Sequence, residues 1–150
     1  MVRLRHRYII AEVQMEEEWK SGNVTRQNAL MEAINKSIRS LHGIQGVALS
    51  KAGLYAKYIN PSTKICFIRM RRTAYEIVTS SLPFVTRLDG QLMSFKTIYT
   101  GATIRHCNIF LQKYHRRELE TKYGSLKSDL QRKLFEAELA NMAPLSVKIS

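Results

Sequence analysis

LYAKYINPSTKICFIRMR, residues 54–71, is the segment from which the architecture of this chain follows. Two runs that favour β-structure, 54–59 and 64–71, flank the tripeptide Asn60-Pro61-Ser62, whose residue types are typical of turns. Two such runs joined by a short turn predict a β-hairpin. Residues 47–50 also favour a strand, so we expect the first strand of the hairpin to begin there, with an interruption before residue 54.

Hydrophobic periodicity predicts the elements on either side of the hairpin. Before the hairpin they are a strand at 7–13 and a helix at 24–42, which ends at Gly43. After the hairpin they are a short helix at 73–82 before Pro83, a strand at 91–99 and a helix that opens at Thr100–Gly101. A last helix at 128–142 opens with a capping box at Ser128. This order predicts an α+β, ferredoxin-like (RRM-like) βαββαβ sandwich with two additional C-terminal helices. We expect one domain at 1–124 and a C-terminal helical extension at 125–150.

The helix that follows the last strand has one apolar and one basic side. In TGATIRHCNIFLQKYHRR, residues 100–117, helical spacing places an apolar set in one sector and a basic set in the opposite one. The apolar set is Ile104, Cys107, Phe110, Leu111 and Tyr114, and the basic set is Arg105, Lys113, Arg116 and Arg117. Thr100 is a candidate N-cap, and Gly101 would let a phosphate approach the free N–H groups of the first turn. An ordinary surface helix with a solvated basic side would show the same pattern.

The charge of the whole chain favours an RNA partner. Lys and Arg number 24 against 12 Asp and Glu, which gives a formal net charge of +12 on 150 residues. Basic residues occur in short clusters beside aromatic ones, as expected where cations meet phosphates and rings meet bases. Apolar runs are too short to span a membrane and no signal peptide is evident, so an intracellular protein is expected. Cys66 and Cys107, without CxxC spacing, are predicted to be reduced, buried thiols.

Catalytic, metal and cofactor sites are not expected. A nuclease that uses two Mg²⁺ ions needs clustered carboxylates, whereas Asp89 and Asp129 are the aspartates of this chain and belong to different elements. The four histidines are scattered, and motifs for a nucleophile elbow or a nucleotide loop are absent. The third strand, KICFIRMRR, also lacks the glycines of the RRM signature. Base stacking on the sheet is therefore not predicted, and RNA contacts are expected on helix faces, loops and the N-terminal arm.

Further residues, in order along the first 119 positions, carry a resemblance. They are Met1-Val2-Arg3, Arg7-Tyr8, His42-Gly43 with Gly46, Tyr58, Asn60, Arg69, Arg71, Leu82-Pro83-Phe84, and GATIR at 101–105 with Cys107, Phe110-Leu111, Tyr114 and Arg116-Arg117. This pattern resembles the small RRM-like protein subunit of eukaryotic ribonuclease P and ribonuclease MRP, the "processing of precursor, subunit five" family. Ala102 stands where that family more often has a second glycine.

The resemblance implies a non-catalytic component of ribonuclease P, which removes the 5′ leader of precursor tRNA, and of ribonuclease MRP, which acts in ribosomal RNA processing. Catalysis would come from the RNA, which this subunit would brace while it binds a TIM-barrel-like thirty-kilodalton subunit and other proteins of the particle. Precursor tRNA would be contacted indirectly, and the location would be the nucleus and nucleolus. The resemblance implies no membrane, small-molecule substrate, cofactor or metal.

Two sets of residues are the candidate binding sites. The RNA-binding set is Arg3, Arg5, Arg7, Arg69, Arg71, Gly101, Arg105, Lys113, Arg116 and Arg117. The partner-binding set, on the last helix, is Leu130, Leu134, Phe135 and Leu139, which repeat at helical spacing. Two alternatives stay open, namely a general or ribosomal RNA-binding protein of the same fold and a small acylphosphatase-type enzyme. The enzyme is disfavoured because the segment after the first strand, QMEEEWKSGN, is acidic where a phosphate loop would be glycine-rich.

Overall fold

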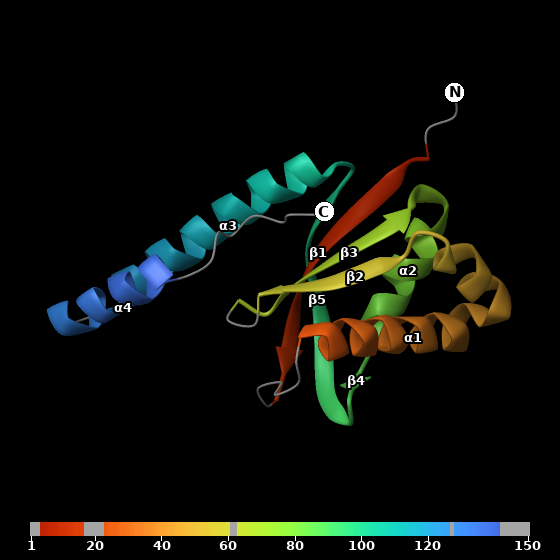
Figure 1. Ribbon diagram of the computed structural model, residues 1–150, viewed down its shortest axis with the longest axis horizontal. Coiled ribbons are helices and arrows are strands. Elements are labelled where there is room, and N and C mark those ends of the chain that lie inside the picture. The colour runs from red at the N-terminus through yellow and green to blue at the C-terminus, as the bar shows by residue number, and fades with distance from the viewer. Residues whose placement is uncertain (1–3, 17–22, 61–62, 127, 142–150) are drawn as a thin grey trace. The chain divides into compact units, whose positions relative to one another are not determined.

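The computed structural model describes residues 4–16, 23–60, 63–126 and 128–141, without the side chains of 23–26, 57–60 and 138–141. Figure 1 shows a sheet with helices along one of its faces, and the helical C-terminal part of the chain. The elements are β1 (His6–Met15), α1 (Asn23–Lys51), β2 (Tyr55–Asn60), β3 (Ile65–Arg71), α2 (Tyr75–Ser81), β4 (Arg87–Leu88), β5 (Gln91–Gly101), α3 (Ile104–Ser125) and α4 (Asp129–Asn141), with short 3₁₀ turns at Arg72–Ala74 and Leu82–Phe84.

The sheet has the strand order β2-β3-β1-β5-β4, and all of its neighbours pair antiparallel. β1 is the central strand, with β3 on one side and β5 on the other. The predicted hairpin is confirmed as β2–β3, although Pro61 and Ser62 of its turn lie outside the described residues. Short β4, which was not predicted, extends the edge beside β5. The predicted ferredoxin-like class is therefore confirmed.

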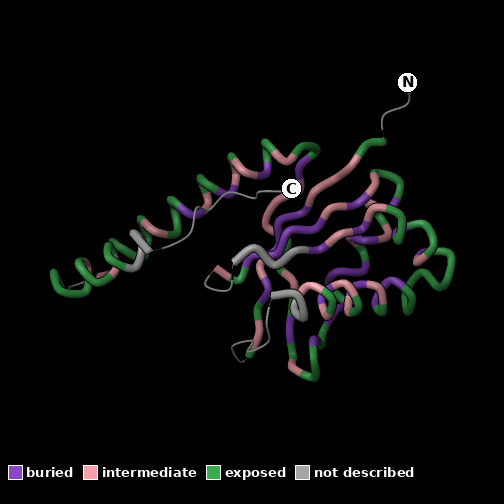
Figure 2. The backbone as a smooth tube through the Cα atoms, viewed as in Figure 1, coloured by how far each residue is buried: buried purple, intermediate pink, exposed green. Residues whose placement is uncertain are grey.

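The hydrophobic core lies between one face of the sheet and helices α1 and α2. Alternate residues of the central strands point into it, because successive side chains of a strand face opposite sides. The strands contribute Ile9, Ala11, Val13, Ala56, Cys66, Ile68 and Met70, and the helices contribute Leu30, Ile34, Ile38 and Val78. In Figure 2 the buried stretches follow the central strands and the inner side of α1. Of the four apolar residues whose spacing predicts the first helix, Leu30, Ile34 and Ile38 are thus buried as expected, whereas Leu41 is 44% exposed.

The other face of the sheet also carries buried residues. Ile10, Ile65 and Phe67 are fully buried, or nearly so, but do not belong to the core cluster beneath the helices. Ile10 pairs with Phe67 across β1 and β3, so both side chains lie on the same side. Further along this face are Tyr8, opposite Arg69, and His6, opposite Arg71.

Two predictions about element boundaries were wrong. Residues 47–50 were predicted as a strand, but they belong to α1, which kinks at Gly43 (φ 65°, ψ −162°) and continues as a helix to Lys51. Glycine reaches that backbone conformation without steric cost, so the chain turns at Gly43 and a second helical segment starts at once. The second error concerns Thr100 and Gly101, which are the last residues of β5 rather than the start of a helix. Strand pairing with β1 extends to both of them, and α3 begins at Ile104.

The chain divides into two units, Met1–Thr103 and Ile104–Ser150, and each is described by itself. The first holds the sheet with α1 and α2, and the second holds α3 and α4. The predicted division into 1–124 and 125–150 stays a prediction. No helix within the described ranges is both long and apolar enough to cross a bilayer.

The kink in α1 makes Gly46 sensitive to substitution. Gly46 is buried, and a Cβ added there would overlap the Cβ of His42. His42 has little freedom to move, because its Nε2 lies 2.8 Å from the Oγ of Ser80 on α2. We predict that Gly46→Ala lowers the free energy of unfolding by about 1–3 kcal/mol, as overpacking does.

Urea denaturation of Gly46→Ala beside Gly124→Ala checks this prediction. Gly124 lies near the end of α3, and a Cβ there would have no atom within 4 Å, so its replacement should be neutral or slightly stabilising. Equal stability of the two variants would contradict the proposed crowding at the kink.

Candidate nucleic-acid interface

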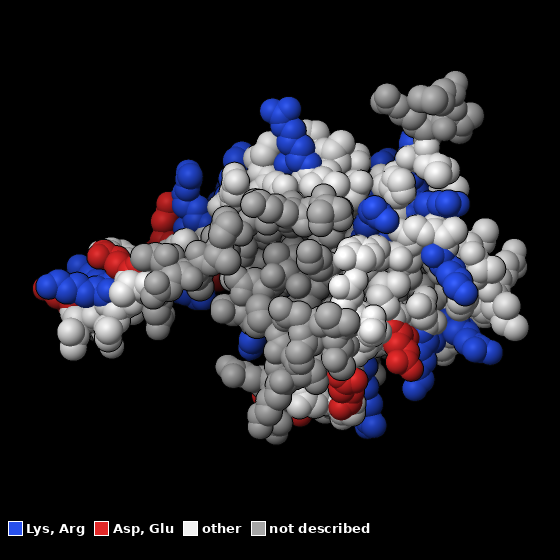
Figure 3. Space-filling model, viewed as in Figure 1, with Lys and Arg blue, Asp and Glu red and all other residues white. Residues whose placement is uncertain are grey.

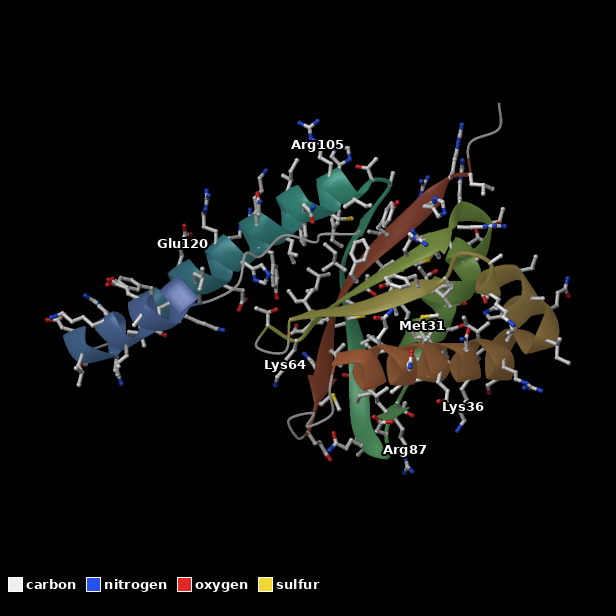
Figure 4. The ribbon with its side chains drawn as sticks, viewed as in Figure 1. Met31, Lys36, Lys64, Arg87, Arg105 and Glu120 are labelled. Carbon is white, nitrogen blue, oxygen red and sulfur yellow. The ribbon has the colours of Figure 1, made fainter. Side chains whose placement is uncertain are left out.

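Helix α3 has the two-sided character that the sequence predicts. Cys107 and Leu111 are fully buried, whereas the basic set is exposed. That set is Arg105, Lys113, Arg116 and Arg117. Arg105 lies in the first turn of α3, and Figure 4 shows its side chain pointing away from the helix. The four basic residues therefore lie together along one side of α3.

Few carboxylates compensate the positive charge. In the part of the chain that the structure describes, ion pairs join Lys96 to Glu12 at 4.0 Å and Arg132 to Asp129 at 3.9 Å, and no cation of the basic set is in one. Figure 3 shows Lys and Arg side chains at many points of the visible face, with fewer Asp and Glu. The basic side of α3 is therefore available to an external anion, and phosphate groups of RNA are such anions.

The N-terminal arginines are divided between different surroundings. Arg3 lies outside the described residues, and Arg5 is exposed just before β1, where its backbone oxygen accepts a 2.9 Å hydrogen bond from the N–H of Arg72. Arg7 is half-buried and its guanidinium donates to the backbone oxygen of His6 at 3.2 Å. It pairs with Met70, a core residue, so Arg7 lies on the helix-covered face of the sheet.

Arg69 and Arg71 lie on the opposite face from Arg7. Both are half-buried, and the Nε of each is buried without a hydrogen-bond acceptor among the residues described. The guanidinium of Arg69 lies over the ring of Tyr55, 5.7 Å from its centre. No ion pair in the described ranges neutralises the charge of these two half-buried side chains, and such a charge favours an anionic ligand.

Gly101 does not have the surroundings predicted for it. It is buried, ends β5 and pairs with Tyr8 of β1, so it does not form a turn at the start of a helix. The free N–H groups of a helix start, which were expected to hold a phosphate beside Gly101, are not at this position, because α3 begins at Ile104. Its assignment to the RNA-binding set is left as a prediction.

Helix α4 exposes part of the predicted partner-binding set. Leu130 is 68% exposed and Leu134 is 60% exposed, Phe135 is half-buried, and the side chain of Leu139 lies outside the described residues. Tyr123 at the end of α3 contacts α4 twice, through a 3.2 Å hydrogen bond from its hydroxyl to Glu136 and beneath the guanidinium of Arg132. The two leucines are thus exposed on a helix that is tied to α3.

Nucleophilic chemistry finds little support in the titratable groups. Burial raises the pKa of the Cys66 thiol to about 12 and that of Cys107 to about 11, so both stay protonated at neutral pH. Burial also lowers the pKa of His115, an effect that Glu118 opposes and Lys122 reinforces. Across the described ranges, no three His, Cys, Asp or Glu side chains gather in a way that could hold a metal ion.

Comparison with known proteins assigns the chain to a family. The model of the Rpp14/Pop5 family matches residues 7–112, which include all of the described sheet except His6, the first residue of β1, and extend to Gln112 in α3. The chain belongs to the Rpp14/Pop5 family.

Curated relatives agree with this assignment, and one solved structure agrees with the fold. The human "Ribonuclease P/MRP protein subunit POP5" is 33% identical over 123 residues, which cover 79% of this chain and 75% of the relative. The protein of the same name from Danio rerio is 33% identical over 138 residues, 88% of this chain and 81% of the relative. A chain in "Cryo-EM structure of yeast Ribonuclease MRP" matches with a TM-score of 0.50 and 13% identity, covering 81% of this chain and 96% of that chain, and so supports the fold alone.

Tyr55 is a residue that sequence reasoning did not select. The alternation of β3 alone places Phe67, Arg69 and Arg71 on one face, but the pairing register is needed to set Tyr55 and Tyr8 on either side of Arg69. In the Rpp14/Pop5 chain, therefore, the face of the sheet opposite the helices holds both cations and rings.

A first variant tests the basic side of α3. We predict that Arg105→Ala weakens RNA binding by about 1–3 kcal/mol and Lys113→Ala by under about 1 kcal/mol, because a guanidinium in the first turn can make a bidentate phosphate contact. The melting temperature should not change, because Arg105 is exposed and has no ion-pair partner in the described ranges. Fluorescence anisotropy and thermal denaturation measure the two effects, and a lower melting temperature with intact RNA affinity would reject the RNA role.

A second pair of variants tests α4. We predict that Leu130→Ser with Leu134→Ser reduces the recovery of partner proteins without a loss of thermal stability, because both side chains are already exposed. Leu92→Ser on β5, where the side chain is 49% exposed, is the matched control and should leave recovery unchanged. A fall in melting temperature with full recovery would show instead that α4 stabilises this chain.

Proposed function

We propose that this chain is a protein subunit of the ribonuclease P/MRP ribonucleoprotein and acts in tRNA and ribosomal RNA processing. The observation that carries this conclusion is the family match over residues 7–112, together with relatives of that name that are 33% identical over most of both chains. The exposed basic side of α3 supports it, because a protein that braces a folded RNA needs cations that its own carboxylates do not neutralise.

We further propose that RNA, rather than this chain, performs the cleavage that removes the 5′ leader of precursor tRNA. The protonated thiols support this proposal, as do the two aspartates, which lie in the β4–β5 turn and at the start of α4. Precursor tRNA would then contact this chain indirectly. A cofactor, a small-molecule substrate or a membrane has no role in the proposed function.

We also propose a protein partner and a location. The partner is the TIM-barrel-like thirty-kilodalton subunit that the family resemblance implies, along with other subunits of the particle. Exposed Leu130 and Leu134 offer it an apolar surface, since exposed apolar patches are frequent at protein interfaces. The location is the nucleus and nucleolus, where ribosomal RNA is processed.

The alternatives are less well supported. Family and relatives favour a particle subunit over a small acylphosphatase-type enzyme. A general or ribosomal RNA-binding protein would share the fold, but its sequence is not expected to match ribonuclease P/MRP subunits along most of its length.

Affinity purification of the tagged chain, followed by sequencing of the recovered RNA, tests the proposal. We predict strong enrichment of the ribonuclease P and MRP RNAs, with leader-cleaving activity in the same fraction. An untagged strain is the control for background RNA. Recovery of ribosomal RNA in place of these two RNAs would support the general RNA-binding protein and reject the proposed function.

A further inference from the structure

A row of three side chains crosses the face of the sheet opposite α1 and α2. In the register of the sheet, Arg69 of β3 lies directly between Tyr8 of β1 and Tyr55 of β2. Residues that oppose each other in an antiparallel pair point to the same side, so all three side chains share one face. The neighbours of Arg69 in β3, Ile68 and Met70, point into the core on the other side.

Contacts within the row hold its planar groups in place. The guanidinium of Arg69 lies over the ring of Tyr55, with 5.7 Å between the guanidinium carbon and the ring centre. The ring of Tyr8 stacks on that of Phe67, with centres 5.6 Å apart and an angle of 29° between the planes. Phe67 is fully buried, whereas Tyr8, Tyr55 and Arg69 are half-buried, so each group of the row packs against a neighbour and keeps some exposed surface.

The same face holds two arginines, Arg69 and Arg71, that are in no ion pair within the described ranges. The Nε atoms of Arg69 and Arg71 are buried, and nothing in the described part of the chain accepts a hydrogen bond from either. Glu12 of β1 lies opposite Ile65 on this face, four residues along the strand from Tyr8. Its carboxylate forms an ion pair with Lys96. Its carboxylate is therefore too far along the strand to neutralise the arginines, because four residues of strand span about 13 Å.

A row of half-exposed rings beside uncompensated guanidinium groups suits an unpaired nucleotide. Exposed bases stack on aromatic rings and on guanidinium planes, while arginine donors bind the phosphate. Base pairs inside a duplex present their edges rather than their faces, so the interior of a duplex does not stack on such a row. The absent RRM signature argued against base stacking on this sheet, but that signature is a pattern along one strand, whereas this row comes from three.

We infer that the Tyr8–Arg69–Tyr55 row binds an unpaired nucleotide of RNA, with the base stacked on the row and the phosphate held by Arg69 and Arg71. The inference rests on the proposed function as an RNA-binding subunit and adds to it the kind of RNA segment that this face takes. Single-stranded segments, at bulges, loops or ends, are the class of ligand that the row selects.

The test compares two RNA probes on the full-length chain. One is a single-stranded decamer with 2-aminopurine at its centre, whose fluorescence reports base stacking, and the other is an RNA duplex of the same length. Tyr55→Leu removes one ring, and Arg69→Lys keeps the charge but removes the plane. Tyr123→Leu is the matched control, because Tyr123 also packs against an arginine, Arg132, at 5.4 Å, but on α3.

We expect Tyr55→Leu and Arg69→Lys each to weaken binding of the single strand about fivefold to a hundredfold, the effect of losing one stacked base. The change in 2-aminopurine fluorescence should disappear with them, while affinity for the duplex changes less than about twofold, since phosphate contacts elsewhere are kept. Tyr123→Leu should leave both probes unaffected. Melting temperatures of the two row variants within about 3 °C of the wild type confirm that the fold is intact.

Unchanged binding of the single strand by folded Tyr55→Leu and Arg69→Lys overturns the inference, and so does an equal loss for both probes. Should Tyr55→Leu unfold, Arg69→Lys alone decides, because its conservative change keeps the charge and most of the side-chain length. Recovery of the ribonuclease P and MRP RNAs with the tagged wild type separates this result from the proposed function. The proposed function stands if those RNAs are recovered while the row variants bind the single strand normally, and it fails if the wild type does not recover them.

Discussion

The pairing of β1 with both β3 and β5 is the interaction on which the rest of the structure depends. β1 is the central strand, so its register sets which residues of both neighbours face the helices and which face away. A shift of one residue would exchange the two faces, since strand side chains alternate. The core residue Ile9 and the row residue Tyr8 therefore depend on the same backbone hydrogen bonds, and the apolar core beneath the helices holds the register that builds the opposite face.

Positive charge occupies two different kinds of surroundings in the two units. The basic set of α3 is exposed, where water and salt screen it and where it can attract a polyanion over a distance of about 10 Å. Arg69 and Arg71 are half-buried in the sheet unit, where screening is weaker and geometry is fixed by packing against Tyr55. For the RNA-binding role proposed above, the first arrangement suits general attachment to phosphates and the second suits recognition of a particular nucleotide geometry.

Local sequence signals predicted most of the elements but not every boundary. The hairpin, the strand at 7–13 and the first half of α1 were predicted correctly, because their apolar residues repeat at the period of the element that they form. Residues 47–50 were not, since their β propensity is a weak local preference that the second segment of α1 overrides. Thr100 is a good N-cap residue in isolation, but its pairing with Ile9 keeps it in the sheet.

The sequence by itself determined the charge, the βαββαβ order without β4, the two-sided character of α3 and the family resemblance, because each depends on residue types and their spacing along one segment. Only the tertiary structure separated Arg7 from Arg69 and Arg71, and only it placed Tyr8, Arg69 and Tyr55 in one row. Within that row, Tyr8 and Arg69 are 61 positions apart in the sequence. The physical reason is that strand register arises from hydrogen bonds between distant segments, and no periodicity within a single segment encodes it.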